Sequence, residues 1–387
     1  MYYFDHCAST PPHEEVIRTM AEVMAKHYAN PSSLHRSGVE AGHLLERSRS
    51  AIAGLFGTEA KEWVFTSGGT ESNNLAIQGA ARANAHKGKH IITTAIEHPS
   101  VYETCKQLER EGFRISFLPV SRNGIVSLED VEAHLTDETI LVTIMHVNNE
   151  VGSIQPVHQI GRMLKDRRRG IVFHVDGVQS VGKLPIDLRS DSIDLFSASA
   201  HKVRGPRGAG LLYIRSGVKL DALLAGGDQE FGMRSGTENV AAIVASAKAF
   251  RMAMESQPER YERMTALRRQ LAEAIAQIPE LVLNGGEQED MAPHIVSFSY
   301  PGMKPEVFIH LLEKHKIAAS TKSACSSKDN KPSRVLEAMG VGQARASSGI
   351  RVSFGDEHGN RELEWLCSML ETVVKKLKPL ERKEIRS

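Results

Sequence analysis

The sequence predicts an α/β fold in which helices cover both faces of a mostly parallel sheet. Short apolar runs alternate with segments of helical periodicity along most of the chain. Within each run the apolar residues are continuous and do not alternate with polar ones, which is typical of strands buried on both faces. Polar residues follow several runs directly, as expected where a sheet binds its ligand at the carboxyl ends of its strands.

The predicted elements follow one another in a regular order. Strands are expected at 63–67, 90–95, 114–118, 139–145, 170–175, 193–196 and 211–214, and later at 294–298, 317–320 and 350–354. Helices are expected at 13–29, 38–56, 69–85, 235–277, 305–315, 333–339 and 361–376, and after the strands 90–95, 114–118 and 139–145. Residues 256–259 interrupt the helical pattern, so we predict a large domain over 16–257 and a small domain made of 1–15 and 258–387.

Length and composition limit the possible classes of protein. The chain has 387 residues, 41% of them hydrophobic, which is enough to bury a large core. The formal net charge is +1 with no long run of one sign, so neither nucleic acid nor a membrane surface is expected as a partner. Cys7, Cys105, Cys325 and Cys367 form no CxxC pair, which disfavours a metal site and indicates a reducing compartment. No signal sequence or membrane span is recognisable, so the prediction is a cytoplasmic protein.

Lys202 lies between two predicted buried strands, 193–196 and 211–214, with no carboxylate beside it in sequence. Burial disfavours a charged ammonium and lowers its pKa, unless the amine is used covalently. A desolvated lysine amine forms Schiff bases with carbonyl compounds, including pyridoxal phosphate. The small residues Ser199, Ala200 and Gly205 leave room for a flat cofactor. The alternative is a surface turn whose lysine faces water.

A second candidate site begins where the strand 63–67 meets Gly68, Gly69 and Thr70 at the start of a helix. Free N–H groups and the helix dipole at such a start bind phosphate, and glycine lets the backbone come close. The same pattern also fits an ordinary strand-to-helix turn.

Polar side chains follow five of the predicted strands; they are Thr70, Glu97, His98, Asn148, Asn149, Asp176, Gln179, His201 and Lys202. A carboxylate at Asp176 suits the pyridinium nitrogen of pyridoxal phosphate, and Gln179 is placed to donate to the phenol oxygen of the ring. His98 would stack on the ring and shuttle protons, unless it is a core histidine. Asn149 would bind the phenol oxygen or a substrate carboxylate.

Cys325 differs from the other cysteines because residues 320–332 around it are small and polar and end in proline, which is typical of a loop. Lys322 and Lys328 would favour its thiolate. An idle surface thiol is the alternative.

Eight motifs, more specific than any single residue, indicate a family. They are Phe65-Thr-Ser-Gly-Gly-Thr-Glu-Ser72, Glu97-His98, Met145-His-Val-Asn-Asn-Glu-Val-Gly152, His174-Val-Asp-Gly-Val-Gln179, Ser199-Ala-His-Lys202, Arg234-Ser-Gly-Thr-Glu-Asn239, Ser323-Ala-Cys325 and Gly349-Ile-Arg351. Together they resemble the pyridoxal-phosphate-dependent cysteine desulfurases over residues 5–378. The resemblance implies a homodimeric fold-type I transferase, with the mostly parallel sheet in a large domain and a smaller α/β C-terminal domain.

The resemblance also implies a role for each candidate residue. Lys202, Cys325 and His98 would be catalytic, with pyridoxal phosphate bound covalently to Lys202. The other cofactor ligands would be Gly69, Thr70, Asn149, Asp176, Gln179, Ser199, His201 and, from the other subunit, Thr237. Asn149 and Arg351 would bind the substrate, Arg351 through a bidentate pair with its carboxylate. No metal is implied.

The implied reaction converts L-cysteine to L-alanine and leaves a persulfide on Cys325. Its sulfur would pass to acceptor proteins for iron–sulfur cluster assembly or for tRNA and cofactor thiolation, and the long stretch 326–333 resembles the subgroup that serves scaffold proteins. Lys322 stands where the family usually has glycine. The alternatives are a selenocysteine lyase, an aminotransferase or a catalytically silent homologue of the same fold. A nicotinamide-dependent dehydrogenase is disfavoured because the sequence lacks the dinucleotide fingerprint.

Overall fold

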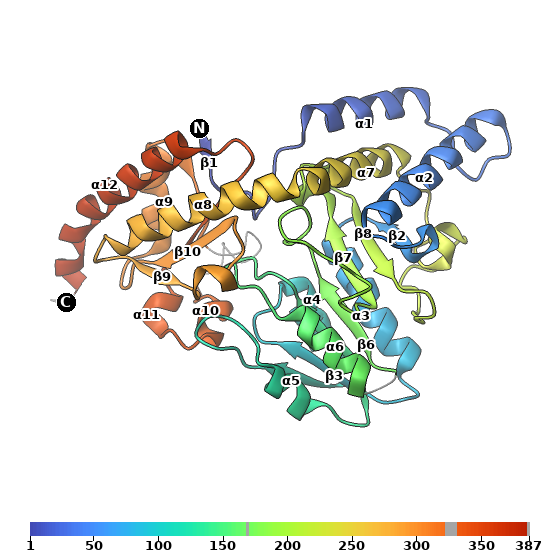
Figure 1. Ribbon diagram of the computed structural model, residues 1–387, viewed down its shortest axis with the longest axis horizontal. Coiled ribbons are helices and arrows are strands. Elements are labelled where there is room, and N and C mark those ends of the chain that lie inside the picture. The colour runs from blue at the N-terminus through green and yellow to red at the C-terminus, as the bar shows by residue number, and fades with distance from the viewer. Residues whose placement is uncertain (168–169, 322–330, 385–387) are drawn as a thin grey trace.

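The computed structural model describes residues 1–167, 170–321 and 331–384 (Figure 1). In it the chain forms a larger body around a seven-stranded sheet and a smaller body around a three-stranded sheet. The predicted helical stretch 235–277 forms two helices, α7 (Val240–Glu255) and α8 (Gln257–Ala276), which meet at Ser256, within the predicted interruption at 256–259. Helix α8 runs from the larger body onto the smaller one (Figure 1).

The large sheet has the strand order β2-β8-β7-β6-β5-β3-β4. Its strands are β2 (Trp63–Thr66), β3 (His90–Thr94), β4 (Arg114–Leu118), β5 (Thr139–Met145), β6 (Val172–Asp176), β7 (Leu195–Ser199) and β8 (Gly210–Ile214). All neighbours are parallel except β8, which is antiparallel to both β2 and β7. The link from β7 to β8 is too short for the crossover that a parallel pair needs. The predicted mostly parallel sheet is confirmed.

Helices cover both faces of this sheet. On one face, the core includes Phe65, Val142 and Leu211, together with residues of α2 (Arg36–Leu55), α5 (Leu128–His134), α6 (Val157–Arg167) and α7. On the other face, Val64, Leu141 and Leu212 pack with residues of α3 (Gly69–Asn84) and α4 (Pro99–Arg110). Neighbouring residues of one strand thus enter opposite cores, which explains why the apolar runs are continuous.

The smaller body is built on an antiparallel sheet in the order β12-β10-β9. Its strands are β9 (Val282–Asn284), β10 (Ile295–Ser299) and β12 (Gly349–Ser353), and a separate parallel pair joins β1 (Tyr2–Tyr3) to β11 (Ile317–Ala318). Helices α8, α9 (Pro305–Lys314) and α12 (Asn360–Glu384) share its core. The short elements α10 (Arg334–Ala338) and α11 (Gln343–Ala346) complete it. Neither β9 nor α11 was predicted, because three or four residues carry no readable periodicity.

In the described part of the chain, the remaining elements are α1 (Glu14–Lys26), which packs against α7, and four short 3-10 segments. These are η1 (Ala60–Glu62), η2 (Ala200–Lys202), η3 (Gln229–Gly232) and η4 (Gln288–Asp290).

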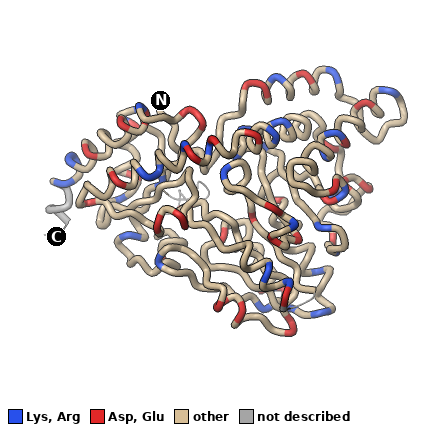
Figure 2. The backbone as a smooth tube through the Cα atoms, viewed as in Figure 1, with Lys and Arg blue, Asp and Glu red and all other residues tan. Residues whose placement is uncertain are grey.

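The predicted domain limits at 15/16 and 257/258 stay a prediction. Acidic and basic residues are interspersed over both bodies (Figure 2). Among the described residues, no helix combines the length and apolar character that a membrane span requires.

Candidate active site

A cavity of about 170 Å³ lies at the carboxyl ends of the parallel strands. Its lining includes ten residues predicted from the sequence: Gly69, Thr70, His98, Asn149, Asp176, Gln179, Ser199, His201, Lys202 and Arg351. Thr237 does not line it and is exposed. Cys325 and Lys322 lie outside the described residues.

The start of α3 forms a cradle for an anion. The helix begins at Gly69, where the first N–H groups have no carbonyl partner within the helix. A Cβ added at Gly69 would lie 2.7 Å from Val178 Cγ2 and 3.6 Å from Ser199 Cβ, so only glycine fits beside them. The hydroxyl of Ser199 is buried and has no hydrogen-bond partner among the described residues. A phosphate group would satisfy both the N–H groups and this hydroxyl.

Lys202 ends η2 and its amine points into the cavity. Nζ donates to the backbone oxygen of Ala8 at 2.9 Å and to that of Cys7. Its own carbonyl accepts a hydrogen bond from the buried amine of Lys183 at 3.0 Å. Lys202 is therefore held at the cavity by contacts of its side-chain amine and of its backbone carbonyl, and the alternative of a surface turn facing water is wrong.

Asp176, at the end of β6, is buried and held by two hydrogen bonds. Oδ2 accepts from Asn73 Nδ2 at 2.8 Å, and Oδ1 accepts from the backbone N–H of Val178 at 3.0 Å. Asn73 was missed by the sequence analysis, although it lies one helical turn after Gly69 and so faces the same edge of the sheet. A carboxylate fixed in this way suits a protonated pyridinium nitrogen.

Burial favours the neutral form of two histidines at the cavity. Burial lowers the pKa of His98, although the negative charge of Asp176 acts in the opposite direction. The Nδ1 atom of His98 accepts from the backbone N–H of Ser100, where His98 caps α4. Burial and the nearby charge of Lys202 lower the pKa of His201 to about 4. A neutral imidazole can accept a proton, which is what a proton shuttle requires.

The smaller body contributes Arg351, on β12, to the lining of the cavity. Its side chain is 2% exposed. Nη2 donates to Asp5 Oδ1 and Nη1 donates to the backbone oxygen of Asn149, both at 2.7 Å. The Nε atom has no partner among the described residues. The Nε2 group of Gln179 donates to the backbone oxygen of Cys7 at 3.1 Å.

Two predicted strand-end residues do not line the cavity. Glu97 turns inward, where its carboxyl accepts from Thr94 Oγ1 at 2.6 Å and from the backbone N–H of Met145. Asn148 donates to the backbone oxygen of Ile96 at 2.9 Å. These side chains fix the loops that carry the cavity residues next to them in sequence. Besides Asn73, the lining residues that the sequence analysis did not identify are Cys7, Ala8, Met145, Val147 and Val178.

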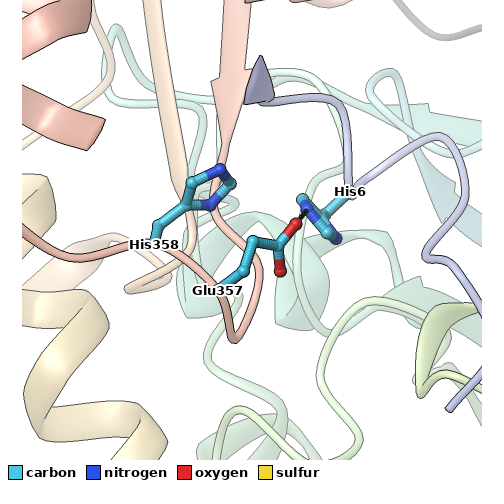
Figure 3. A group of neighbouring side chains, drawn as sticks. All are labelled: His6, Glu357 and His358. Atoms are coloured by element: carbon cyan, nitrogen blue, oxygen red, sulfur yellow. Dashed lines mark hydrogen bonds and ion pairs between the residues drawn. The ribbon is translucent and has the colours of Figure 1, made fainter. Parts of the chain in front are cut away.

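A cluster of His6, Glu357 and His358 lies beside the site and resembles a metal-binding group (Figure 3). His6 Nε2 hydrogen-bonds Glu357 Oε1 at 2.8 Å. The Nδ1 atom of His358 accepts from the backbone N–H of Gly355 at 2.8 Å, so its lone pair is already used. The ring of His358 also stacks on Phe4. These contacts hold the three side chains in place, and we assign no metal to the cluster.

Comparison with known proteins agrees with this architecture. Residues 2–366 match the family model described as aminotransferase class-V. The chain belongs to this family and, by its similarity to curated relatives, to the cysteine desulfurases within it. It is 44% identical to a protein of Escherichia coli named cysteine desulfurase IscS, over 98% of this chain and 94% of the relative.

Two solved structures extend the comparison. A structure titled NifS-like protein has a TM-score of 0.91 at 36% identity and covers 97% of this chain and 100% of its own. A structure titled SspA in complex with cysteine has a TM-score of 0.80 at 34% identity, with 92% of this chain and 99% of its own covered.

Proposed function

We propose that the protein converts L-cysteine to L-alanine and leaves the released sulfur on Cys325. The observation that carries the proposal is the single cavity in which Lys202, Asp176, His98 and Arg351 meet beside an anion cradle. The names of the relatives support the same activity. The solved structure whose title includes bound cysteine supports the substrate.

The cavity fits pyridoxal phosphate. The N-terminus of α3, with Gly69 and Thr70, would hold the phosphate together with Ser199 and His201, and the unpartnered hydroxyl of Ser199 supports this role. Asp176 would face the pyridinium nitrogen, and Lys202 would bind the cofactor covalently. Asn149 and Gln179 would contact the phenol oxygen. When bound, pyridoxal phosphate supplies an electron sink for negative charge that develops at the substrate Cα.

The remaining steps fall to side chains of this chain. Arg351 binds the substrate carboxylate, and the Lys202 amine takes the proton from Cα, with His98 as a second proton carrier. The Cys325 thiolate, which lies outside the described residues, attacks the substrate sulfur. One C–S bond breaks and one S–S bond forms, and the carbon receives the proton that completes the methyl group of alanine. L-Cysteine and the enzyme thiol thereby become L-alanine and an enzyme persulfide, with no external oxidant or reductant.

We also propose a homodimer in which Thr237 reaches the partner's cofactor phosphate. Thr237 is exposed, and the nearby Arg234 pairs with Glu71 at 2.9 Å in the first turn of α3. Large hydrophobic side chains are exposed on α1, on α2 and between them: Ile17, Met24, Tyr28, Leu34 and Val39. Such a surface is typical of a contact between subunits. Acceptor proteins of iron–sulfur assembly or thiolation, and a cytoplasmic location, stay predictions.

The test is to incubate the purified protein with L-cysteine, pyridoxal phosphate and a thiol reductant, and to measure alanine and sulfide. We expect equal amounts of both. The variant Lys202→Ala should lose the absorbance band of the bound cofactor. Its rate of alanine formation should fall at least about 100-fold, which is the lower bound for the loss of a positioned base. Lys219→Ala, a change of an exposed lysine, is the matched control. A keto acid as product, or an unchanged band in Lys202→Ala, would contradict the proposal.

A further inference from the structure

The N-terminal segment 5–10 contributes Cys7 and Ala8 to the lining of the cavity, although it belongs to no predicted motif. The backbone oxygens of Cys7 and Ala8 accept hydrogen bonds from Lys202. The backbone N–H of Thr10 donates to the oxygen of His201 at 3.0 Å. The side chain of Asp5 pairs with Arg351. One short segment thus contacts both Lys202 and Arg351, which lie 195 and 346 residues away from their partners in it.

We propose that Asp5 is a positioning residue, which orients the guanidinium of Arg351 for the substrate carboxylate. The inference rests on the proposed function, because it takes Arg351 as the group that binds this carboxylate.

The hydrogen bonds of Arg351 carry the argument. A guanidinium is planar and has five N–H donors. One Nη2 donor goes to Asp5 and one Nη1 donor to the backbone of Asn149. Because Nη1 and Nη2 are both held, the orientation of the guanidinium plane is fixed. The Nε donor, which is buried without a partner, and the second hydrogen of Nη2 remain for a bidentate contact with another carboxylate.

Asp5 is itself held in register with the strand that carries Arg351. The backbone N–H of Ser353 donates to the oxygen of Phe4 at 2.8 Å, and the backbone N–H of Cys7 donates to Ser353 Oγ at 2.9 Å. Ser353 and Arg351 lie two positions apart on β12 and so face the same side of the strand. The backbone on both sides of Asp5 is therefore fixed to β12, and this fixes the position of the Asp5 carboxylate relative to the Arg351 guanidinium. Phe4, buried in the smaller core, adds a further anchor.

The charge of Asp5 has a second consequence. A buried guanidinium without a counter-charge is costly, so removal of the whole side chain also affects stability. A test of positioning must therefore separate orientation from folding. Asp5→Asn keeps an acceptor oxygen at the same place and removes only the charge, whereas Asp5→Ala removes both.

The test measures the binding of L-cysteine and of cysteamine to the pyridoxal-phosphate-loaded full-length protein, through the change in cofactor absorbance. Cysteamine is L-cysteine without its carboxylate. In Asp5→Ala we expect the Kd of L-cysteine to rise about 10-fold to 100-fold, the effect of one charge-assisted hydrogen bond. In Asp5→Asn it should stay within about 3-fold of the unmodified protein, since the acceptor is kept. The Kd of cysteamine should change less than about 3-fold in both variants.

The contact predicts a non-additive cycle with Arg351. Once Arg351→Ala has removed the guanidinium, adding Asp5→Ala should change the Kd of L-cysteine less than about 2-fold. Should Asp5→Ala fail to fold, Asp5→Glu takes its place, because the longer side chain keeps the charge and displaces the guanidinium. It should weaken L-cysteine binding and leave cysteamine binding unchanged.

The proposal is overturned if L-cysteine and cysteamine are weakened equally, if Asp5→Asn loses as much as Asp5→Ala, or if the cycle is additive. Tighter binding of L-cysteine in Asp5→Ala would also overturn it. An unmodified protein that binds L-cysteine but forms no alanine would contradict the proposed function and leave this inference standing.

Discussion

In the loop after β3, Glu97 is a fully buried carboxylic acid that directly precedes the cavity residue His98. Burial raises the pKa of Glu97 to about 8, even though the hydrogen bonds from Thr94 and Met145 act in the opposite direction. At neutral pH the folded protein therefore holds a proton on Glu97 that the unfolded chain releases at an ordinary pKa near 4.5.

This difference predicts a pH dependence of stability. A group whose pKa is raised by folding stabilises the folded state most below its unfolded pKa, so the contribution of Glu97 should fall between about pH 4.5 and pH 8. In Glu97→Gln this part of the slope should be absent. Urea midpoints at several pH values would measure it, with Glu262→Gln, a change of an exposed residue, as the control. Parallel slopes in Glu97→Gln and the unmodified protein would contradict the assignment.

Residues of the site were predictable to different degrees. Lys202 and Asp176, which line the cavity, were predicted because each follows an apolar run, at the edge of the sheet where ligands bind. Glu97 follows a strand in the same way but turns inward, because side-chain direction in a loop is decided by packing. Asp5 had no sequence signal at all, since its partner Arg351 lies 346 residues away.

At the scale of single elements, β6 and β7 show how packing selects a residue. Gly177 follows β6, and a Cβ added there would lie 1.9 Å from the ring of Phe196 on the neighbouring β7. The ring is fully buried and occupies the space that a side chain at 177 would need. The glycine at 177 is thus explained by the bulk of Phe196.

Gly177→Ala should therefore destabilise the protein by about 1–3 kcal/mol, the usual cost of overpacking a core. Phe196→Leu should relieve the clash, so that the double variant is more stable than the sum of the two single changes predicts. Gly54→Ala is the matched control, because Gly54 lies in α2 with nothing within 4 Å of an added Cβ. Denaturation midpoints in urea would measure all four variants. Strictly additive stability changes in the double variant would show that the Phe196 ring and Gly177 act independently.

At the scale of the whole molecule, the larger body exposes apolar side chains beside α1 and α2. Leu34 is 97% exposed and Tyr28 is 86% exposed. Neither contributes to the core of the single chain, and their exposure fits the proposed contact with a second subunit. The proposed sharing of Thr237 between two cavities requires such a contact.

Leu34→Asp should leave the folding of one chain intact and weaken the dimer. Each buried leucine contributes about 1.5–3 kcal/mol, so the dimer dissociation constant should rise at least about 10-fold. Sedimentation at several protein concentrations would measure it, and retention of pyridoxal phosphate should fall as monomers form. Val307→Asp, a change on α9 of the smaller body, is the control. An unchanged dimer dissociation constant in Leu34→Asp would show that Leu34 is not part of a contact between subunits.

The sequence by itself determined the covered parallel sheet, the order of its main elements and the residues at the strand ends. Continuous apolar runs indicate strands that are buried on both faces, and short motifs indicate particular turns and helix starts. Both signals come from residues that are neighbours in the sequence. The tertiary structure alone decided that β2 pairs with β8, that Glu97 turns inward and that Asp5 meets Arg351. Each of these depends on where distant segments cross, which no local pattern of residues encodes.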